Sequence, residues 1–141
     1  MAGKSFRCRL ITPEARLIDD DVTYAQLPLW DGQAGILYRR APLMAKLGMG
    51  ELRLDYAAGG AHSYLIEDGF VQMVGDTLTL LAQRAIPVER INEEEARTEL
   101  AEAEARKPQG ADDQTRVTRD RDRARLKIRL AQQFKARGGG I

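Results

Sequence analysis

The chain has 141 residues, of which 43% are hydrophobic and 30% are charged, which is typical of a folded protein with a modest apolar core. Lysine and arginine total 22 and aspartate and glutamate total 21, so the formal net charge of +1 gives no overall basic character that would favour nucleic acid. No apolar run is long enough for a transmembrane helix, the first residues lack the apolar segment of a secretory signal, and the single cysteine, Cys8, excludes an intramolecular disulfide.

The first part of the chain, residues 4–88, has the sequence pattern of β-strands. Apolar and polar residues alternate over 6–11, with a period of two, and turns are expected at 67–69 and at Gly75-Asp76. Short strands that are separated by turns about every ten residues are typical of sandwiches and barrels. We therefore predict that residues 1–88 form an antiparallel β-sandwich or barrel of about ten short strands.

The pattern changes to that of helices after Pro87. Asn92, followed by Glu95, is a capping-box arrangement that predicts a helix start, and Pro108 cannot continue that helix. A second apolar pattern with helical spacing runs to Arg137. We predict that residues 89–141 form an antiparallel αα hairpin, which is a separate domain.

The two predicted helices carry opposite charges. Residues 89–107 contain seven acids and four bases, whereas residues 112–137 contain nine bases and four acids. Opposite charges favour antiparallel pairing, while the apolar seam between the helices is thin, so we expect a hairpin of marginal stability. The bases of the second helix are also suited to an acidic partner, and the candidate contact residues are Arg116, Arg119, Arg121, Arg123, Arg125 and Arg129.

No polar cluster has the pattern of a catalytic or metal site. The acidic runs 19–21 and 93–95 fall in expected turns or in a first helical turn, where acids complement the helix dipole. His62 has no nucleophile motif near it, and one histidine with one cysteine cannot form a usual structural zinc site. Gly32 and Gly35 lack the Gly-Lys-Ser/Thr ending of a phosphate loop. We therefore predict no catalytic residue, no metal and no cofactor.

Two features allow two interpretations each. Trp30, at a strand end, is either an anchor at the core or its rim, or a contact residue for a partner. The pair Arg39-Arg40 is either a solvated turn or a contact site. The sequence pattern alone leaves both features open.

A series of short motifs, in this order, resembles the epsilon subunit of the F-type rotary ATP synthase over nearly the whole chain. Each motif is weak alone, and their order, spacing and change from strands to two helices carry the resemblance. The motifs are Ile11-Thr-Pro-Glu14, Gly32-Gln-Ala-Gly-Ile-Leu37, Ala41-Pro-Leu43, Gly50-Glu-Leu-Arg-Leu54, Asp68-Gly-Phe-Val71 and Leu78-Thr-Leu-Leu-Ala82.

The resemblance implies a non-catalytic subunit of the central stalk. Such a subunit couples the gamma subunit to the membrane rotor ring for proton-driven ATP synthesis, and its C-terminal helices regulate ATP hydrolysis at the catalytic beta subunits. It implies a peripheral location on the cytoplasmic face of the inner membrane, without direct membrane insertion and without nucleic acid. The residues that it places at the gamma and ring contact are Asp31, Gln33, Tyr38, Arg39 and Arg40.

The chain departs from the family pattern at two places. Tyr38-Arg39-Arg40 stands where the family usually has Pro-Gly-His, so the polar contacts of this loop are expected to differ. Some relatives bind ATP through an Asp-x-x-Arg motif, where this chain has Asn92 and Glu95, and the added acid should repel phosphates. We therefore predict no ATP binding by the hairpin. The alternatives are a non-enzymatic β-sandwich adaptor and an RNA-binding module that uses the basic helix.

Overall fold

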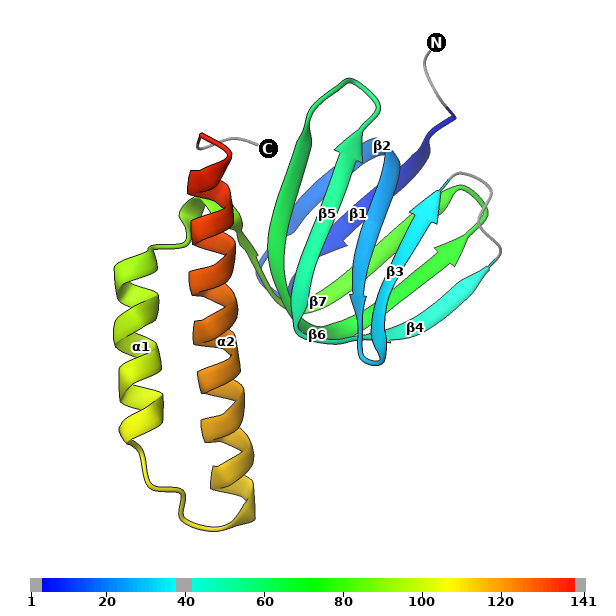
Figure 1. Ribbon diagram of the computed structural model, residues 1–141. Coiled ribbons are helices and arrows are strands. Elements are labelled where there is room, and N and C mark those ends of the chain that lie inside the picture. Colours follow the sequence, from blue (N-terminus) through cyan, green and yellow to red (C-terminus); the bar gives the residue numbers. More distant parts are fainter. Residues whose placement is uncertain (1–3, 38–41, 139–141) are drawn as a thin grey trace. The chain divides into compact units, whose positions relative to one another are not determined.

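The computed structural model describes residues 4–37 and 42–138, and the chain divides into two compact units between Pro87 and Val88. The first unit consists of strands and the second of helices (Figure 1). The predicted fold class, a β-sandwich followed by an αα hairpin, is confirmed.

The strands of the first unit form a nearly closed ring. β1 pairs with β7 and β2, β7 with β6, β6 with β5, and β5 with β2, while β3 and β4 extend the sheet from β2 and β6. All of these pairs are antiparallel except β1–β7, which is parallel. The strands are β1 (Phe6–Ile11), β2 (Arg16–Leu29), β3 (Gly32–Leu37), β4 (Leu43–Leu47), β5 (Gly50–Tyr56), β6 (Ala61–Val74) and β7 (Thr77–Pro87).

The described residues contain seven strands rather than about ten, because β2 and β6 are each 14 residues long. The turn expected at 67–69 is wrong, since this segment is a bend inside β6. Asp68 has φ 59° and Gly69 has φ 123°, and these left-handed conformations redirect the strand without reversing it. Before the bend β6 pairs with β5, and after it with β4. The predicted hairpin at Gly75-Asp76 is confirmed, with Val74 opposite Thr77.

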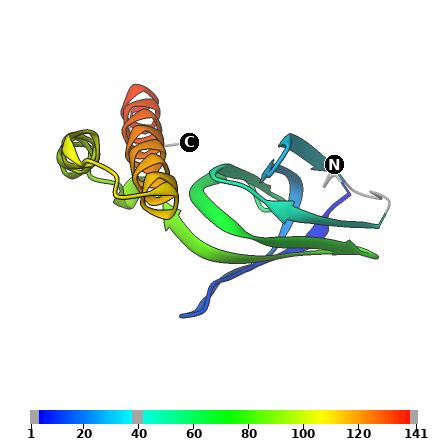
Figure 2. The same ribbon diagram turned by 90° about the horizontal axis from the view of Figure 1, so that it is seen from below.

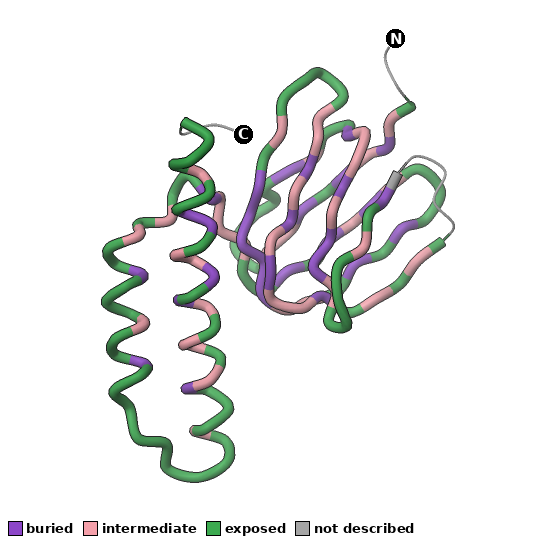
Figure 3. The backbone as a smooth tube through the Cα atoms, in the orientation of Figure 1, coloured by how far each residue is buried: buried purple, intermediate pink, exposed green. Residues whose placement is uncertain are grey.

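The core of the first unit is built from one side of each strand. Buried positions alternate along β1 and β5, as the purple segments of Figure 3 show. Cys8 is fully buried, and burial, with Asp20 and Asp19 nearby, raises the pKa of its thiol to about 12. The thiol of Cys8 is therefore buried and protonated at neutral pH. The largest core side chains include Phe6, Leu10, Leu27, Ile36, Leu52, Leu54, Met73, Leu78 and Leu80.

The second unit is a helical hairpin that starts with a 3₁₀ turn, η1 (Val88–Arg90). It continues with α1 (Glu93–Ala105) and α2 (Ala111–Ala136), which run side by side in Figure 1 and in the turned view of Figure 2. The Asn92 side chain accepts a hydrogen bond of 3.0 Å from the Glu95 backbone N–H, which confirms the predicted helix start.

The buried residues of the hairpin are small on one helix and larger on the other. Those of α1 are Ala96 and Ala103, while α2 buries Val117, Ala124, Leu126, Leu130 and Ala131. Two alanines offer little apolar area, so α1 has few apolar contacts with which to hold α2. Among the described residues, neither helix is long and apolar enough to cross a membrane.

Candidate interaction surfaces

The outer side of β4, β6 and β7 exposes large apolar side chains, three of which line one pocket. Met44, Phe70 and Leu81 are 75%, 60% and 52% exposed, and we call this group the apolar face. Phe70 lies opposite Leu81 in the β6–β7 pair, and Met44 lies opposite Gln72 in the β4–β6 pair. The sheet register therefore brings together residues that are as far apart in sequence as 44 and 81.

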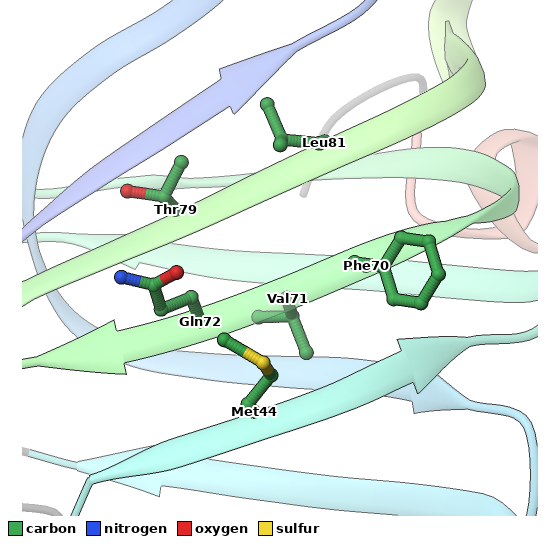
Figure 4. Close-up of a pocket in the computed structure, with 6 residues that line it drawn as sticks. All are labelled: Met44, Phe70, Val71, Gln72, Thr79 and Leu81. Atoms are coloured by element: carbon green, nitrogen blue, oxygen red, sulfur yellow. The ribbon is translucent and has the colours of Figure 1, made fainter.

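The apolar face lines a shallow pocket of about 260 Å³ (Figure 4). Gln72 and Thr79 line it beside the three apolar side chains and leave only a small polar contribution. Among the residues that the structure describes, none that lines this pocket is charged, so its surface fits an apolar group of a partner better than a polar ligand.

Basic residues stand next to the apolar face. Lys46 is exposed and lies opposite Phe70, and Arg9 lies opposite Thr79 in the parallel β1–β7 pair. Arg9 is not fully available, because its Nε lies 3.4 Å from the Asp19 carboxylate. A partner with apolar side chains and acidic neighbours would complement both the apolar face and its basic border.

The turn between β2 and β3 forms a second exposed surface. Trp30 is 69% exposed at this turn, so it is not buried in the core, and its interpretations as an anchor at the rim and as a contact residue both stay predictions. Asp31 and Gln33 are exposed beside it, and the Gln33 side chain is hydrogen-bonded to Gln26. Gly32, with φ 138°, supplies the backbone conformation of the turn.

The backbone links this turn to the apolar face. The Trp30 N–H donates to the Lys46 carbonyl at 3.0 Å, and the Gly48 N–H donates to the Pro28 carbonyl at 2.8 Å. β4, which carries Met44, is therefore attached to the base of the β2–β3 turn. The other predicted contact residues, Tyr38, Arg39 and Arg40, lie outside the described residues, and the contact roles of Asp31 and Gln33 stay predictions.

The six arginines predicted for the basic helix have different surroundings. Arg116, Arg119 and Arg129 are exposed, whereas Arg121 and Arg123 are partly buried. Arg123 bonds to Asp120 on its own helix at 3.1 Å, and Arg125 lies 3.4 Å from Glu104 of α1. The arginines therefore do not form one uniformly available stripe.

Ion pairs connect α1 and its C-cap residue to the part of α2 between Asp120 and Lys135, and we call them the charge ladder. Its members are Glu93–Lys135 at 3.4 Å, Glu99–Lys127 at 3.0 Å, Glu104–Arg125 at 3.4 Å and Arg106–Asp120 at 2.7 Å. The sequence predicted opposite charges on the two helices but not these pairings, since partners that are 14 to 42 residues apart leave no local pattern.

Glu93 is the most connected carboxylate of the charge ladder. It accepts from Arg97 Nη2 at 2.7 Å, from Gln132 Nε2 at 3.2 Å and from Lys135 Nζ at 3.4 Å. The hydrogen bond from Arg97, followed by those from Gln132 and Lys135, lowers the pKa of the Glu93 carboxyl below its usual value. The pKa of Asp120 is lowered in the same way, first by Arg106 and then by Arg123.

The apolar face was missed by the sequence interpretation, although a pattern pointed to it. In the segment Phe70-Val-Gln-Met-Val74, two of the three outward positions, Phe70 and Val74, are apolar. Apolar residues on the outward side of a strand depart from the alternation of a half-exposed sheet and can mark an interaction surface. Among the described residues, no group of three or more His, Cys, Asp or Glu could hold a metal ion.

Comparisons with known proteins give one consistent result. A family model described as "ATP synthase, Delta/Epsilon chain, beta-sandwich domain" matches residues 5–88. The ATP synthase epsilon chain of Rhodopirellula baltica is 39% identical over 99 residues, which is 70% of this chain and 77% of that one. The sodium ion specific ATP synthase epsilon chain of Propionigenium modestum is 26% identical over 132 residues, covering 92% and 96% of the two chains.

A solved structure shares the fold. A chain in the Euglena gracilis mitochondrial ATP synthase structure, described as OSCP/F1/c-ring in rotational state 1, superposes with a TM-score of 0.71 at 19% identity. The match covers 96% of this chain and 82% of that one.

Proposed function

This chain belongs to the family of ATP synthase delta and epsilon chains, and on that premise we propose that it is a non-catalytic central-stalk subunit of an F-type ATP synthase. In this role it couples the gamma subunit to the membrane rotor ring for proton-driven ATP synthesis. The observation that carries the proposal is the family match over residues 5–88, the same part of the chain that carries the apolar face.

The gamma subunit is the proposed partner of the apolar face. Burying the exposed parts of Met44, Phe70 and Leu81 would contribute about 1 to 2 kcal/mol for each side chain. The basic border at Lys46 favours acidic residues on gamma around an apolar contact. The nearly closed ring of strands makes this unit stiff, which suits a part that transmits torque.

The rotor ring is the proposed partner of the β2–β3 turn. Trp30 offers a large exposed ring, and Asp31 and Gln33 offer polar groups beside it. The predicted contact residues Tyr38, Arg39 and Arg40 follow β3 in the sequence. Because β4 joins this turn to the apolar face, one strand would connect the two docking surfaces. The protein would lie at the membrane periphery, on the cytoplasmic face of the inner membrane.

The helical hairpin is the proposed regulator of ATP hydrolysis. Its basic helix α2 would bind acidic residues of the catalytic beta subunits when the hairpin opens. We propose that the hairpin binds no ATP, because the Asn92 side chain is already used to cap α1 and three glutamates, Glu93 to Glu95, occupy its first turn. A titration with ATP up to millimolar concentration, followed by NMR shifts of residues 91–97, tests this proposal.

Affinity purification from membranes in mild detergent tests the central-stalk proposal. The tagged chain should recover gamma, the ring subunits and the catalytic subunits, whereas an adaptor or an RNA-binding module would recover unrelated partners or RNA. Phe70→Glu should lose gamma, and Ala58→Glu, which changes an exposed alanine in the turn between β5 and β6, should retain it. Recovery of gamma by both variants would refute the assignment of this surface.

A further inference from the structure

We propose that α1 is an internal competitor for the partner of α2, because its carboxylates bind three α2 cations, Arg125 among them, that an acidic partner could bind as well. While the hairpin is closed, these cations are masked, and opening the hairpin means exchanging one set of acids for another. This inference rests on the proposed regulatory role of the hairpin and deepens it.

The charge ladder covers α1 from its first turn to its C-cap. Glu93, the first residue of α1, binds the C-terminal end of α2 through Lys135, and Arg106, the C-cap residue, binds Asp120 near the other end of the hairpin. Glu99 and Glu104 fill the middle. Of the four ion pairs, three place an acid of α1 on a cation of α2, which is the arrangement that an external acidic surface would copy.

The stability of the closed hairpin depends strongly on polar contacts, because α1 buries little apolar area against α2. Its buried residues are two alanines, and its outer surface is exposed, as the green tube of Figure 3 shows. Exposed ion pairs are individually weak and are screened by salt, since the Debye length falls from about 10 Å at 0.1 M to about 3 Å at 1 M. The closed state should therefore depend on ionic strength.

Three of the α2 cations, Arg125, Lys127 and Lys135, are bound by α1 carboxylates, although the side chains of Arg125 and Lys135 stay 55% and 74% exposed. Arg116 and Arg129 are exposed and are not members of the charge ladder. An acidic partner can first bind the exposed arginines and then replace the α1 carboxylates one pair at a time. Such an exchange avoids a state in which several cations lose their partners together.

Distances between two spin labels in the full-length chain test the masking. Labels at Ala101→Cys and Gln133→Cys report on the separation of α1 and α2, since both positions are exposed. Cys8 is replaced by alanine in every sample, so that only the two introduced cysteines react. Raising NaCl from about 0.05 M to about 1 M should move part of the population to longer distances.

Two triple variants with equal charge change provide the matched comparison. Glu93→Gln, Glu99→Gln and Glu104→Gln remove the ladder carboxylates, while Glu94→Gln, Glu95→Gln and Glu102→Gln remove exposed carboxylates of the same helix that are not members of the ladder. The ladder triple should lengthen the label distance and increase affinity for a poly-glutamate peptide about tenfold more than the control triple does. Far-UV circular dichroism checks that α2 stays helical.

Exchanging the two charges of one ion pair distinguishes loss of that pair from simple unfolding of the variant. Lys127→Glu should open the hairpin, and adding Glu99→Lys should close it again by restoring the pair. Equal behaviour of the two triples, no response to salt, or no rescue by the exchange would each overturn the masking. Since the isolated chain contains no gamma or catalytic subunits, such a failure leaves the central-stalk proposal intact, and a failed purification leaves the masking intact.

Discussion

Among the described glycines, Gly69 is the one at which substitution by alanine should destabilise the β unit most. A Cβ atom at this residue would lie 1.9 Å from the Leu81 carbonyl oxygen and 2.9 Å from the Ala82 Cα. Both contacts are with the backbone of β7, so no side chain can rotate away to relieve them. The φ of 123° adds strain for any residue with a Cβ.

The expected cost follows from these two contributions. The backbone conformation costs about 1 to 3 kcal/mol for a non-glycine residue. Moving β7 away from a contact of 1.9 Å must also disturb β6–β7 hydrogen bonds, at about 1 kcal/mol each. We therefore expect Gly69→Ala to lower the free energy of unfolding of the β unit by about 4 kcal/mol.

Gly75→Ala is the matched control, because Gly75 also has a positive φ, 58°, while a Cβ there meets nothing within 4 Å. This control should cost only about 1 kcal/mol. Urea denaturation followed by tryptophan fluorescence measures both variants, with Trp30 as the single tryptophan. Equal losses for Gly69→Ala and Gly75→Ala would refute the role of the close backbone approach.

The remaining predictions concern the core, the cysteine, the ladder and the docking surface. Ile36→Ala should destabilise the β unit by about 2 to 5 kcal/mol in the same urea assay, because this side chain is fully buried; a loss below 1 kcal/mol would contradict that burial. Cys8 should react with a thiol reagent only in denaturant, because burial raises its pKa to about 12. The folded-state pKa of Glu93 lies below the usual 4.5, so its stabilisation is complete above that value and is lost as the pH falls below it; spin-label distances between pH 6 and pH 2 should show opening over that interval. Phe70→Ser should lose gamma in the purification with an unchanged urea midpoint, because its side chain is 60% exposed.

Local patterns predicted the parts of the fold that local contacts decide. The Gly75-Asp76 hairpin and the Asn92 cap depend on residues that are next to each other or three apart, and both formed as expected. Strand alternation likewise identified β1 by its buried side.

The rest depends on contacts between distant residues. Asp68-Gly69 has the composition of a turn, and only the pairing of β6 with three other strands makes it a bend. Leu81 joins Phe70 on the apolar face because of a register that the sequence of neither strand fixes alone. Trp30 could be placed outside the core only when the β2–β3 turn was known.

The position of β7 in the sheet determines how the β unit would resist a force that is applied through the hairpin. Its last residue, Pro87, leads directly into the helical hairpin, so any pull on the hairpin is applied to this strand. β6 holds one edge of β7 from Tyr64 to Val74, and β1 holds the other edge from Arg7 to Ile11. A force along β7 would load both rows of backbone hydrogen bonds in shear, so that many bonds must break together. The strand that closes the ring is thus the one best placed to carry load from the moving helices.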